Sequence, residues 1–125
     1  MAVILLIDDD WFYRNVIRRI LQSNGHRVIE AADGAEGLEM YESYKPALVI
    51  TDMRMPGVAG AEVIQAIREK DHHALIIAVS GAATFYNVDF FKLAKEVGAD
   101  VILRKLDPAD RVLVEVTRLL ETGRR

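Results

Sequence analysis

The chain has 125 residues, of which 51% are hydrophobic and 28% are charged, and its net charge at pH 7 is −3. This length and balance are typical of one soluble globular domain, and the negative charge argues against a surface that binds nucleic acid. The chain contains no cysteine, which excludes disulfides, thiol catalysis and cysteine-based metal sites. Its longest apolar run, residues 1–7, is too short to span a membrane, so we expect a cytoplasmic protein with no membrane contact.

Five short segments are predicted to be strands. Most are β-branched or aliphatic runs without polar alternation, as expected for strands that are covered on both faces. The segments are residues 3–7, 27–31, 47–51, 75–79 and 101–103.

Each predicted strand is followed by a segment with the apolar spacing of an amphipathic helix. The first helix runs from Trp11 to a left-handed cap at Asn24 and Gly25, with Asp10 as its N-cap. The other predicted helices cover residues from about 35 to the stop before Pro46, the region around 63–67, residues 84–97, and a last helix that starts at Pro108 with Asp107 as its N-cap.

This alternation predicts an α/β fold with a single doubly wound (βα)5 domain and a five-stranded parallel sheet. We expect the domain to cover residues 1–122, with a tail at 123–125. In such a sheet the carboxyl ends of all strands lie at one edge, and ligands bind there. The residues that follow the strands are therefore the candidates for function.

Polar side chains follow four of the five predicted strands. Asp8 and Asp9 come after the first strand and Asp52 after the third. Ser80 follows the fourth strand and Lys105 the fifth. Three carboxylates, a hydroxyl and an amine are thus expected to meet at one edge of the sheet.

Carboxylates that lie within several Å of one another repel, so the cluster implies a cation. Oxygen ligands without histidine or cysteine favour a hard ion, and Mg²⁺ suits a few carboxylates with room for water. Lys105 and Ser80 could hold the oxygens of an anion over Asp52. Since aspartate can form an aspartyl phosphate, this pattern favours phosphoryl transfer onto Asp52.

Four motifs in order resemble the response-regulator receiver domain of two-component signal transduction, to which chemotaxis regulators belong. They are LIDDD at 6–10, ITDMRMPG at 50–57, VSG at 79–81 and GADVILRK at 98–105, and the resemblance covers essentially the whole chain. It implies a flavodoxin-like strand order of 2-1-3-4-5, which the handedness of the connections alone does not fix.

The resemblance also implies a role for each site residue. Asp52 would be the phosphoacceptor, and Asp9 and Asp52 would bind Mg²⁺ together with the backbone carbonyl of Arg54. Asp8 would complete the acidic pocket. Ser80 and Lys105 would bind the phosphoryl oxygens.

The implied function is a phosphorylation switch that catalyses only its own phosphorylation and dephosphorylation. A sensor histidine kinase or a phosphotransfer protein would supply the phosphoryl group, and an output protein or a fused effector domain would receive the signal. The resemblance further implies self-association through the face formed by residues 84–97, 101–103 and the last helix. Whether these residues are a whole protein or the receiver of a longer chain is left open.

Two positions depart from the usual family pattern. Ile102 stands where the family commonly has an aromatic residue, and Leu106 stands where a proline usually follows the lysine. Because a cis bond before a residue other than proline costs about 3 kcal/mol, we predict a trans Lys105–Leu106 bond. These departures favour one alternative, a degenerate receiver that acts as a phosphorylation-independent interaction module.

Residues 82–87 form a surplus of roughly one helical turn. We predict that Phe85 or Phe91 lies on an exposed patch for a partner or for self-association; a slightly enlarged core is the alternative. Two further function classes rank lower. A haloacid-dehalogenase-like phosphatase needs an acid where Arg54 stands, and a nucleotide binder needs a Gly-rich loop after the first strand.

Overall fold

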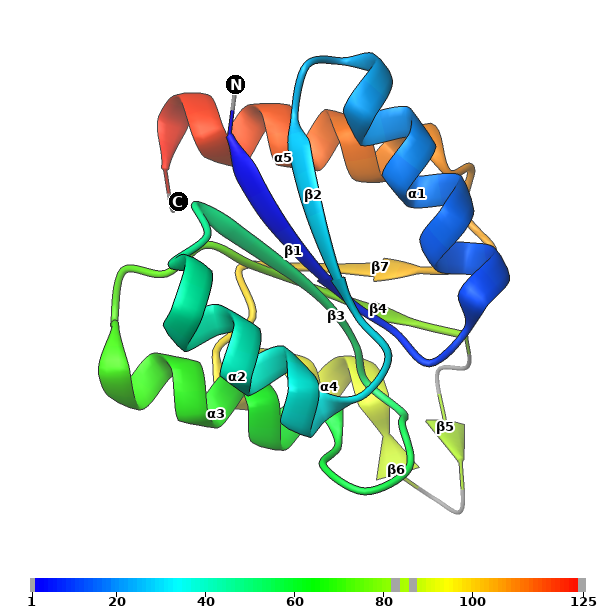
Figure 1. The fold of residues 1–125 in the computed structure, drawn as a ribbon. Helices are drawn as coiled ribbons and strands as arrows, with labels where there is room; N and C mark the ends of the chain where they lie inside the picture. Colours follow the sequence, from blue (N-terminus) through cyan, green and yellow to red (C-terminus); the bar gives the residue numbers. More distant parts are fainter. Residues whose placement is uncertain (1, 82–83, 86–87, 124–125) are drawn as a thin grey trace.

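The computed structural model describes residues 2–81, 84–85 and 88–123. Its main sheet has five parallel strands in the order β2-β1-β3-β4-β7, which confirms the predicted α/β fold and strand order (Figure 1). The strands are β1 (Val3–Ile7), β2 (Arg27–Ala31), β3 (Leu48–Asp52), β4 (Ile76–Ser80) and β7 (Val101–Arg104). The helices are α1 (Trp11–Ser23), α2 (Gly34–Tyr44), α3 (Gly60–Lys70), α4 (Phe90–Val97) and α5 (Asp110–Thr122).

The helices cover both faces of the sheet, so there are two cores. On one face α1 and α5 bury Ile17, Leu21 and Val116 against β1, β3 and β4. On the other face α2, α3 and α4 pack together (Figure 1), with Ile64 and Ala94 fully buried. Covered faces explain why β1, β3 and β4 are almost continuously apolar.

Local signals in the sequence begin and end the helices. The carboxylate of Asp10 accepts hydrogen bonds from the N–H groups of Phe12 and Tyr13, at 3.0 and 3.2 Å, and so caps α1 as predicted. At the other end Asn24 is the C-cap, and Gly25 has a φ of +88°. Within the described residues, no helix is long and apolar enough to cross a membrane.

The region before α4 differs from the predicted helix over 84–97. Two short strands, β5 (Thr84–Phe85) and β6 (Val88–Asp89), pair antiparallel there, and α4 begins only at Phe90. The carboxylate of Asp89 accepts hydrogen bonds from the N–H groups of Phe91 and Lys92, each at 3.1 Å, which fixes the later start of the helix. In Figure 1 the β5–β6 pair extends away from the main sheet.

The start of the last helix is also later than predicted. The α5 helix begins at Asp110, with Ala109 rather than Asp107 at the N-cap. The carboxylate of Asp107 instead accepts a hydrogen bond of 3.1 Å from the N–H of Arg104. This contact closes the turn after β7, and two residues, Pro108 and Ala109, separate Asp107 from the first residue of the helix.

Candidate functional site

The parallel register brings the ends of four strands to one edge. Asp52 is the last residue of β3 and Ser80 is the last residue of β4. Their neighbours in the ladder are Val79 and Arg104 respectively, so Lys105 follows directly beside Ser80. Asp8 extends β1 by one residue and donates its N–H to the Ala31 carbonyl at 3.0 Å.

Lys105 joins two of the predicted carboxylates. Its Nζ lies 2.9 and 2.7 Å from the two carboxylate oxygens of Asp8 and 3.2 Å from Oδ2 of Asp52. The Asp8 side chain is fully buried and the Asp52 side chain is 5% exposed. Because these charges are largely removed from water, the ammonium stabilises both carboxylates much more than a surface ion pair would.

A third carboxylate, Asp9, completes the acidic cluster and is exposed to solvent. Oxygen atoms of Asp8, Asp9 and Asp52 lie within 4.8 Å of one another. The cluster opens into a cavity of about 630 Å³, which Ser80 and Lys105 also line. The lining of the cavity therefore combines carboxylates with an amine and a hydroxyl.

The electrostatics of the cluster follow from burial and from the closeness of like charges. Burial and the charge of Asp8 raise the pKa of Asp52 to about 7, although Lys105 opposes this. Burial likewise raises the pKa of Asp8. Burial alone would lower the pKa of Lys105, but its hydrogen bond to Asp8 and the charge of Asp52 outweigh that and raise it.

Close backbone packing holds the loop after Asp52. A Cβ atom on Gly60 would lie 2.1 Å from the carbonyl oxygen of Asp52 and 2.6 Å from Cα of Met53, so only glycine fits there. The N–H of Gly60 donates to the Met53 carbonyl at 3.2 Å. The N–H of Arg54 lies 3.4 Å from Oδ1 of Asp52, which places the backbone of Arg54 at the rim of the acidic cluster.

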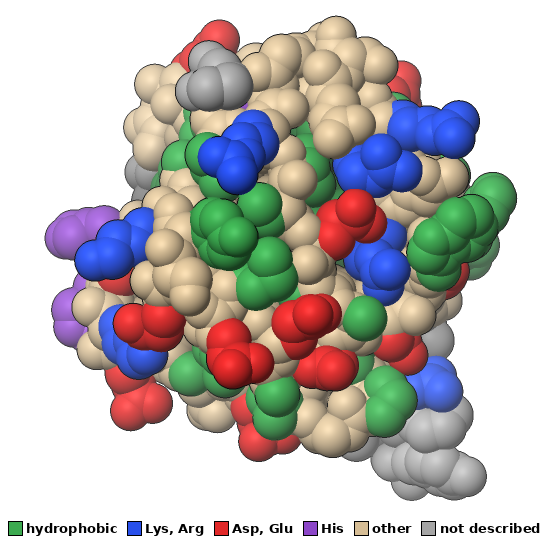
Figure 2. All heavy atoms as spheres, in the orientation of Figure 1, with side chains coloured by type: hydrophobic (Ala, Val, Ile, Leu, Met, Phe, Trp, Pro, Cys, Tyr) green, Lys and Arg blue, Asp and Glu red, His purple; other side chains and the backbone are tan. Residues whose placement is uncertain are grey.

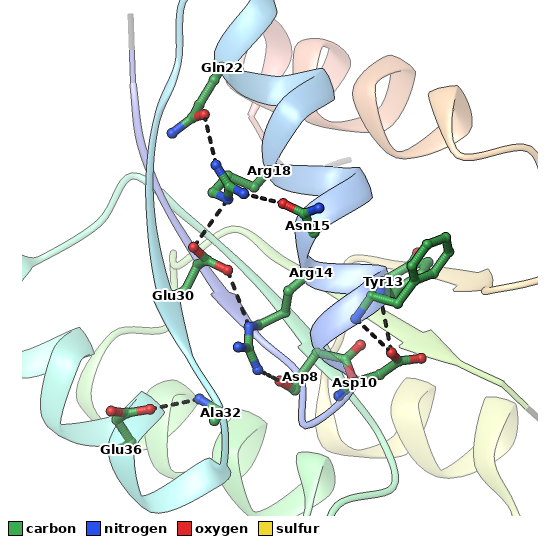
Figure 3. A network of polar contacts seen from close by, with 11 residues as sticks. Asp8, Asp10, Tyr13, Arg14, Asn15, Arg18, Gln22, Glu30, Ala32 and Glu36 are labelled. Carbon is green, nitrogen blue, oxygen red and sulfur yellow. Dashed lines mark hydrogen bonds and ion pairs between the residues drawn. The ribbon is translucent and has the colours of Figure 1, made fainter.

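Arg14 is a site-supporting residue that the sequence reasoning missed. Figure 3 shows its side chain reaching from α1 toward the end of β1 and toward Glu30 on β2. Its guanidinium donates to the Asp8 carbonyl at 2.7 Å and to Glu30 at 3.2 Å. Arg18 binds the other carboxylate oxygen of Glu30, also at 3.2 Å. The network ties the peptide after Asp8 to α1 and β2.

Tyr13 is the second residue that the sequence reasoning missed. The Nζ of Lys105 lies 4.8 Å from the centroid of its ring, within the range of a cation–π contact. Burial and the nearby charges of Asp8 and Asp52 raise the pKa of the Tyr13 hydroxyl. The sequence placed Tyr13 in the first turn of a helix that follows Asp8, and so near the predicted acidic cluster. Its partner Lys105, however, is 92 residues further along the chain, and the sequence did not link the two.

The surface near the start of α1 is apolar. Trp11 and Phe12 are 66% and 67% exposed, and hydrophobic side chains stand out there at the right edge of Figure 2. On the same face, acidic side chains gather over α2.

The two departures from the family pattern lie outside the cavity lining. Ile102 is half-buried and packs against the core, whereas Leu106 is 88% exposed. The Lys105–Leu106 peptide bond is trans, as predicted. Of the two aromatic residues predicted for an exposed patch, Phe91 is half-buried, and the side chain of Phe85 lies outside the described part of the structure.

Comparisons with known proteins agree with this geometry. A family model described as the response regulator receiver domain matches residues 4–117. The chemotaxis protein CheY of Bacillus subtilis (strain 168) is 36% identical over 118 residues, which cover 94% of this chain and 96% of that protein. The chemotaxis protein CheY of Halobacterium salinarum is 37% identical over 102 residues, 82% of each chain.

A solved structure gives the same result. The response regulator receiver domain protein from Clostridium thermocellum superposes with a TM-score of 0.86 and 28% sequence identity, over 97% of this chain and 95% of that one. The family model covers most of the chain and the fold agrees over nearly all of it. The chain therefore belongs to the response regulator receiver domain family.

Proposed function

We propose that this chain is a phosphoacceptor switch in which Asp52 takes a phosphoryl group from the phosphohistidine of a sensor histidine kinase or a phosphotransfer protein. Receiver domains are signalling switches rather than metabolic enzymes. The observation that carries the proposal is the position of the Lys105 ammonium, which contacts both Asp8 and Asp52 at the wall of an open cavity. This arrangement offers an incoming phosphoryl group both a nucleophile and a cation at the same wall of the cavity.

The proposed step is an in-line displacement at phosphorus. A carboxylate oxygen of Asp52 forms the new O–P bond while the P–N bond of the donor breaks, and the imidazole leaves with the bonding electron pair. Lys105 exchanges its contact with Asp52 for a contact with a phosphoryl oxygen. Ser80, which lines the same cavity, donates its hydroxyl to another phosphoryl oxygen.

The acidic cluster fits the Mg²⁺ that the receiver family binds at an acidic pocket. Asp9, Asp52 and the backbone carbonyl of Arg54 would hold the ion, and Asp8 would complete the pocket. Three carboxylates within 4.8 Å of one another are hard oxygen ligands, and the 630 Å³ cavity leaves room for water. When bound, the ion supplies positive charge to the phosphoryl oxygens.

A switch needs a second conformation that the phosphorylated form prefers. A change from mostly off to mostly on requires about 5 kcal/mol of differential stabilisation. Contacts from Lys105 and Ser80 to the phosphoryl group are the source of that difference in our proposal. Residues 1–122 would form the switching domain, and its output would go to a separate protein or to a fused effector domain.

Intact mass spectrometry tests the proposal. The protein is incubated with Mg²⁺ and acetyl phosphate, and we expect the wild type to gain the mass of one phosphoryl group while Asp52→Asn gains none. Asp33→Asn is a matched control, since Asp33 is an exposed N-cap on α2 outside the acidic cluster. A wild type that stays unmodified would favour the phosphorylation-independent interaction module instead.

Self-association through α4, β7 and α5 belongs to the same proposal. Sedimentation velocity with and without Mg²⁺ and beryllofluoride, which mimics the phosphoryl group, tests it. We expect a larger species only in the presence of beryllofluoride. A protein that stays monomeric at every concentration would remove dimerisation from the proposal and leave the phosphoacceptor role standing.

A further inference from the structure

The ring of Tyr13 provides Lys105 with a partner that carries no charge. Tyr13 lies in the first turn of α1, where its N–H donates to the capping carboxylate of Asp10 at 3.2 Å. Its ring centroid is 4.8 Å from the Lys105 ammonium, close enough for attraction between the cation and the negative face of the ring. The ammonium is therefore enclosed by the ring and by the carboxylates of Asp8 and Asp52.

These two kinds of partner respond differently to a divalent cation. The carboxylates are the groups that would hold Mg²⁺, so the ion and the ammonium compete for the same oxygens. The aromatic face of Tyr13 offers no ligand atom to the ion, so its attraction for the ammonium does not depend on the carboxylates.

We propose that Tyr13 is a positioning residue for Lys105, whose ring keeps the ammonium inside the cavity when Mg²⁺ occupies the carboxylates. The lysine stem is long and flexible, and without the ring it would sample positions away from the incoming phosphoryl group. The inference rests on the proposed phosphoacceptor function. It adds that the aromatic side chain, and not the hydroxyl, is what the site requires at this position.

Three variants separate the ring from other effects. Tyr13→Phe keeps the ring and removes the hydroxyl, whereas Tyr13→Leu removes the ring; Tyr13→Met is a second ring-free variant in case the leucine variant does not fold. Phe12→Leu is the matched control, because Phe12 is the adjacent aromatic residue of the same helix and is 67% exposed.

Proton NMR tests the contact without any phosphorylation. The ring current of Tyr13 should shift the ε-methylene protons of Lys105 upfield. We expect this upfield shift in the wild type, in Tyr13→Phe and in Phe12→Leu, both without metal and with saturating Mg²⁺. We expect the shift to be lost in the two ring-free variants. An upfield shift that disappears when Mg²⁺ is added to the wild type would overturn the inference.

The rate of phosphorylation by acetyl phosphate tests the consequence. We expect Tyr13→Leu to react about fivefold more slowly than the wild type, in line with a cation–π contact at a partly desolvated site, and Tyr13→Phe to restore the rate to within about twofold. If the wild type reacts and Tyr13→Leu reacts equally fast, only the role of Tyr13 fails. If the wild type does not react at all, the proposed function fails and this inference fails with it.

Discussion

The Asp52→Asn substitution should stabilise the metal-free protein at alkaline pH, although it removes the proposed phosphoacceptor. Asp52 is buried beside Asp8, and its pKa rises from 3.8 to about 7. Each tenfold change in an ionisation equilibrium corresponds to about 1.4 kcal/mol, so ionised Asp52 lowers the free energy of unfolding by at most about 4 kcal/mol. Because asparagine cannot pair with Lys105 as a carboxylate does, we expect a net gain of about 1 to 3 kcal/mol at pH 8.

The pH dependence of stability has a definite sign. Between pH 4 and pH 7 the folded Asp52 binds a proton that the unfolded chain has already lost, so the free energy of unfolding falls as the pH rises. The wild type should therefore become more stable from pH 8 down to about pH 5. The asparagine variant should show a shallower dependence, and the difference between the two proteins should shrink toward pH 5.

Urea unfolding in EDTA at several pH values measures this effect, with circular dichroism and the fluorescence of Trp11, the single tryptophan, as signals. Adding Mg²⁺ should reverse the order of stability at pH 8, because a ligand present at 100 times its Kd stabilises the protein that binds it by about 2.7 kcal/mol. The reasoning would be refuted if the asparagine variant were less stable than the wild type at pH 8 in EDTA, and if this difference in stability were the same at pH 5 as at pH 8.

Three further substitutions test parts of the site. Gly60→Ala should lower the free energy of unfolding by about 3 kcal/mol in urea titrations, because its Cβ would lie 2.1 Å from the Asp52 carbonyl oxygen; an unchanged midpoint would contradict the close packing. Lys105→Met should bind Mg²⁺ about tenfold more tightly than the wild type in titrations followed by Trp11 fluorescence, since the ammonium no longer competes for the carboxylates. Weaker Mg²⁺ binding by the variant would contradict this competition. Leu106→Ser should change the free energy of unfolding by less than about 0.5 kcal/mol and leave the phosphorylation rate unchanged, because the Leu106 side chain is 88% exposed. A slower phosphorylation would show that this position takes part in the site.

The strand ends were predictable because four of the five apolar runs lead into polar residues. Asp8, Asp52, Ser80 and Lys105 all lie at or just after the ends of apolar runs that are typical of covered strands, and the parallel register then brings them to one edge. Local chemistry was therefore sufficient for this part of the site. The strand order came from the family resemblance, since five βα units can be arranged in more than one way.

The region before α4 was not predictable from helical spacing. The apolar spacing over residues 84–97 predicted one long helix, whereas the short β5 and β6 strands pair with each other and the helix starts after Asp89. The capping aspartate was a signal for this later start. A helix and a pair of short strands compete over such a short segment, and the outcome depends on contacts that spacing does not reveal.

The supporting residues Tyr13 and Arg14 were missed for a different reason. Their helix was predicted correctly, but their partners come from other elements: Lys105 after β7, and Glu30 on β2. Which side chains face each other across elements depends on the strand order and on the direction of each side chain. Spacing along one helix does not contain that information.

The most direct measurement of the central claim locates the phosphoryl group on the chain. The protein is phosphorylated with acetyl phosphate and Mg²⁺, the acyl phosphate is reduced with borohydride, and the modified residue is identified by peptide mass spectrometry. We expect homoserine at position 52 and unmodified aspartate at positions 8 and 9. Reduction at another aspartate, or at none in a protein that has gained phosphoryl mass, would contradict the assignment of Asp52 as the phosphoacceptor.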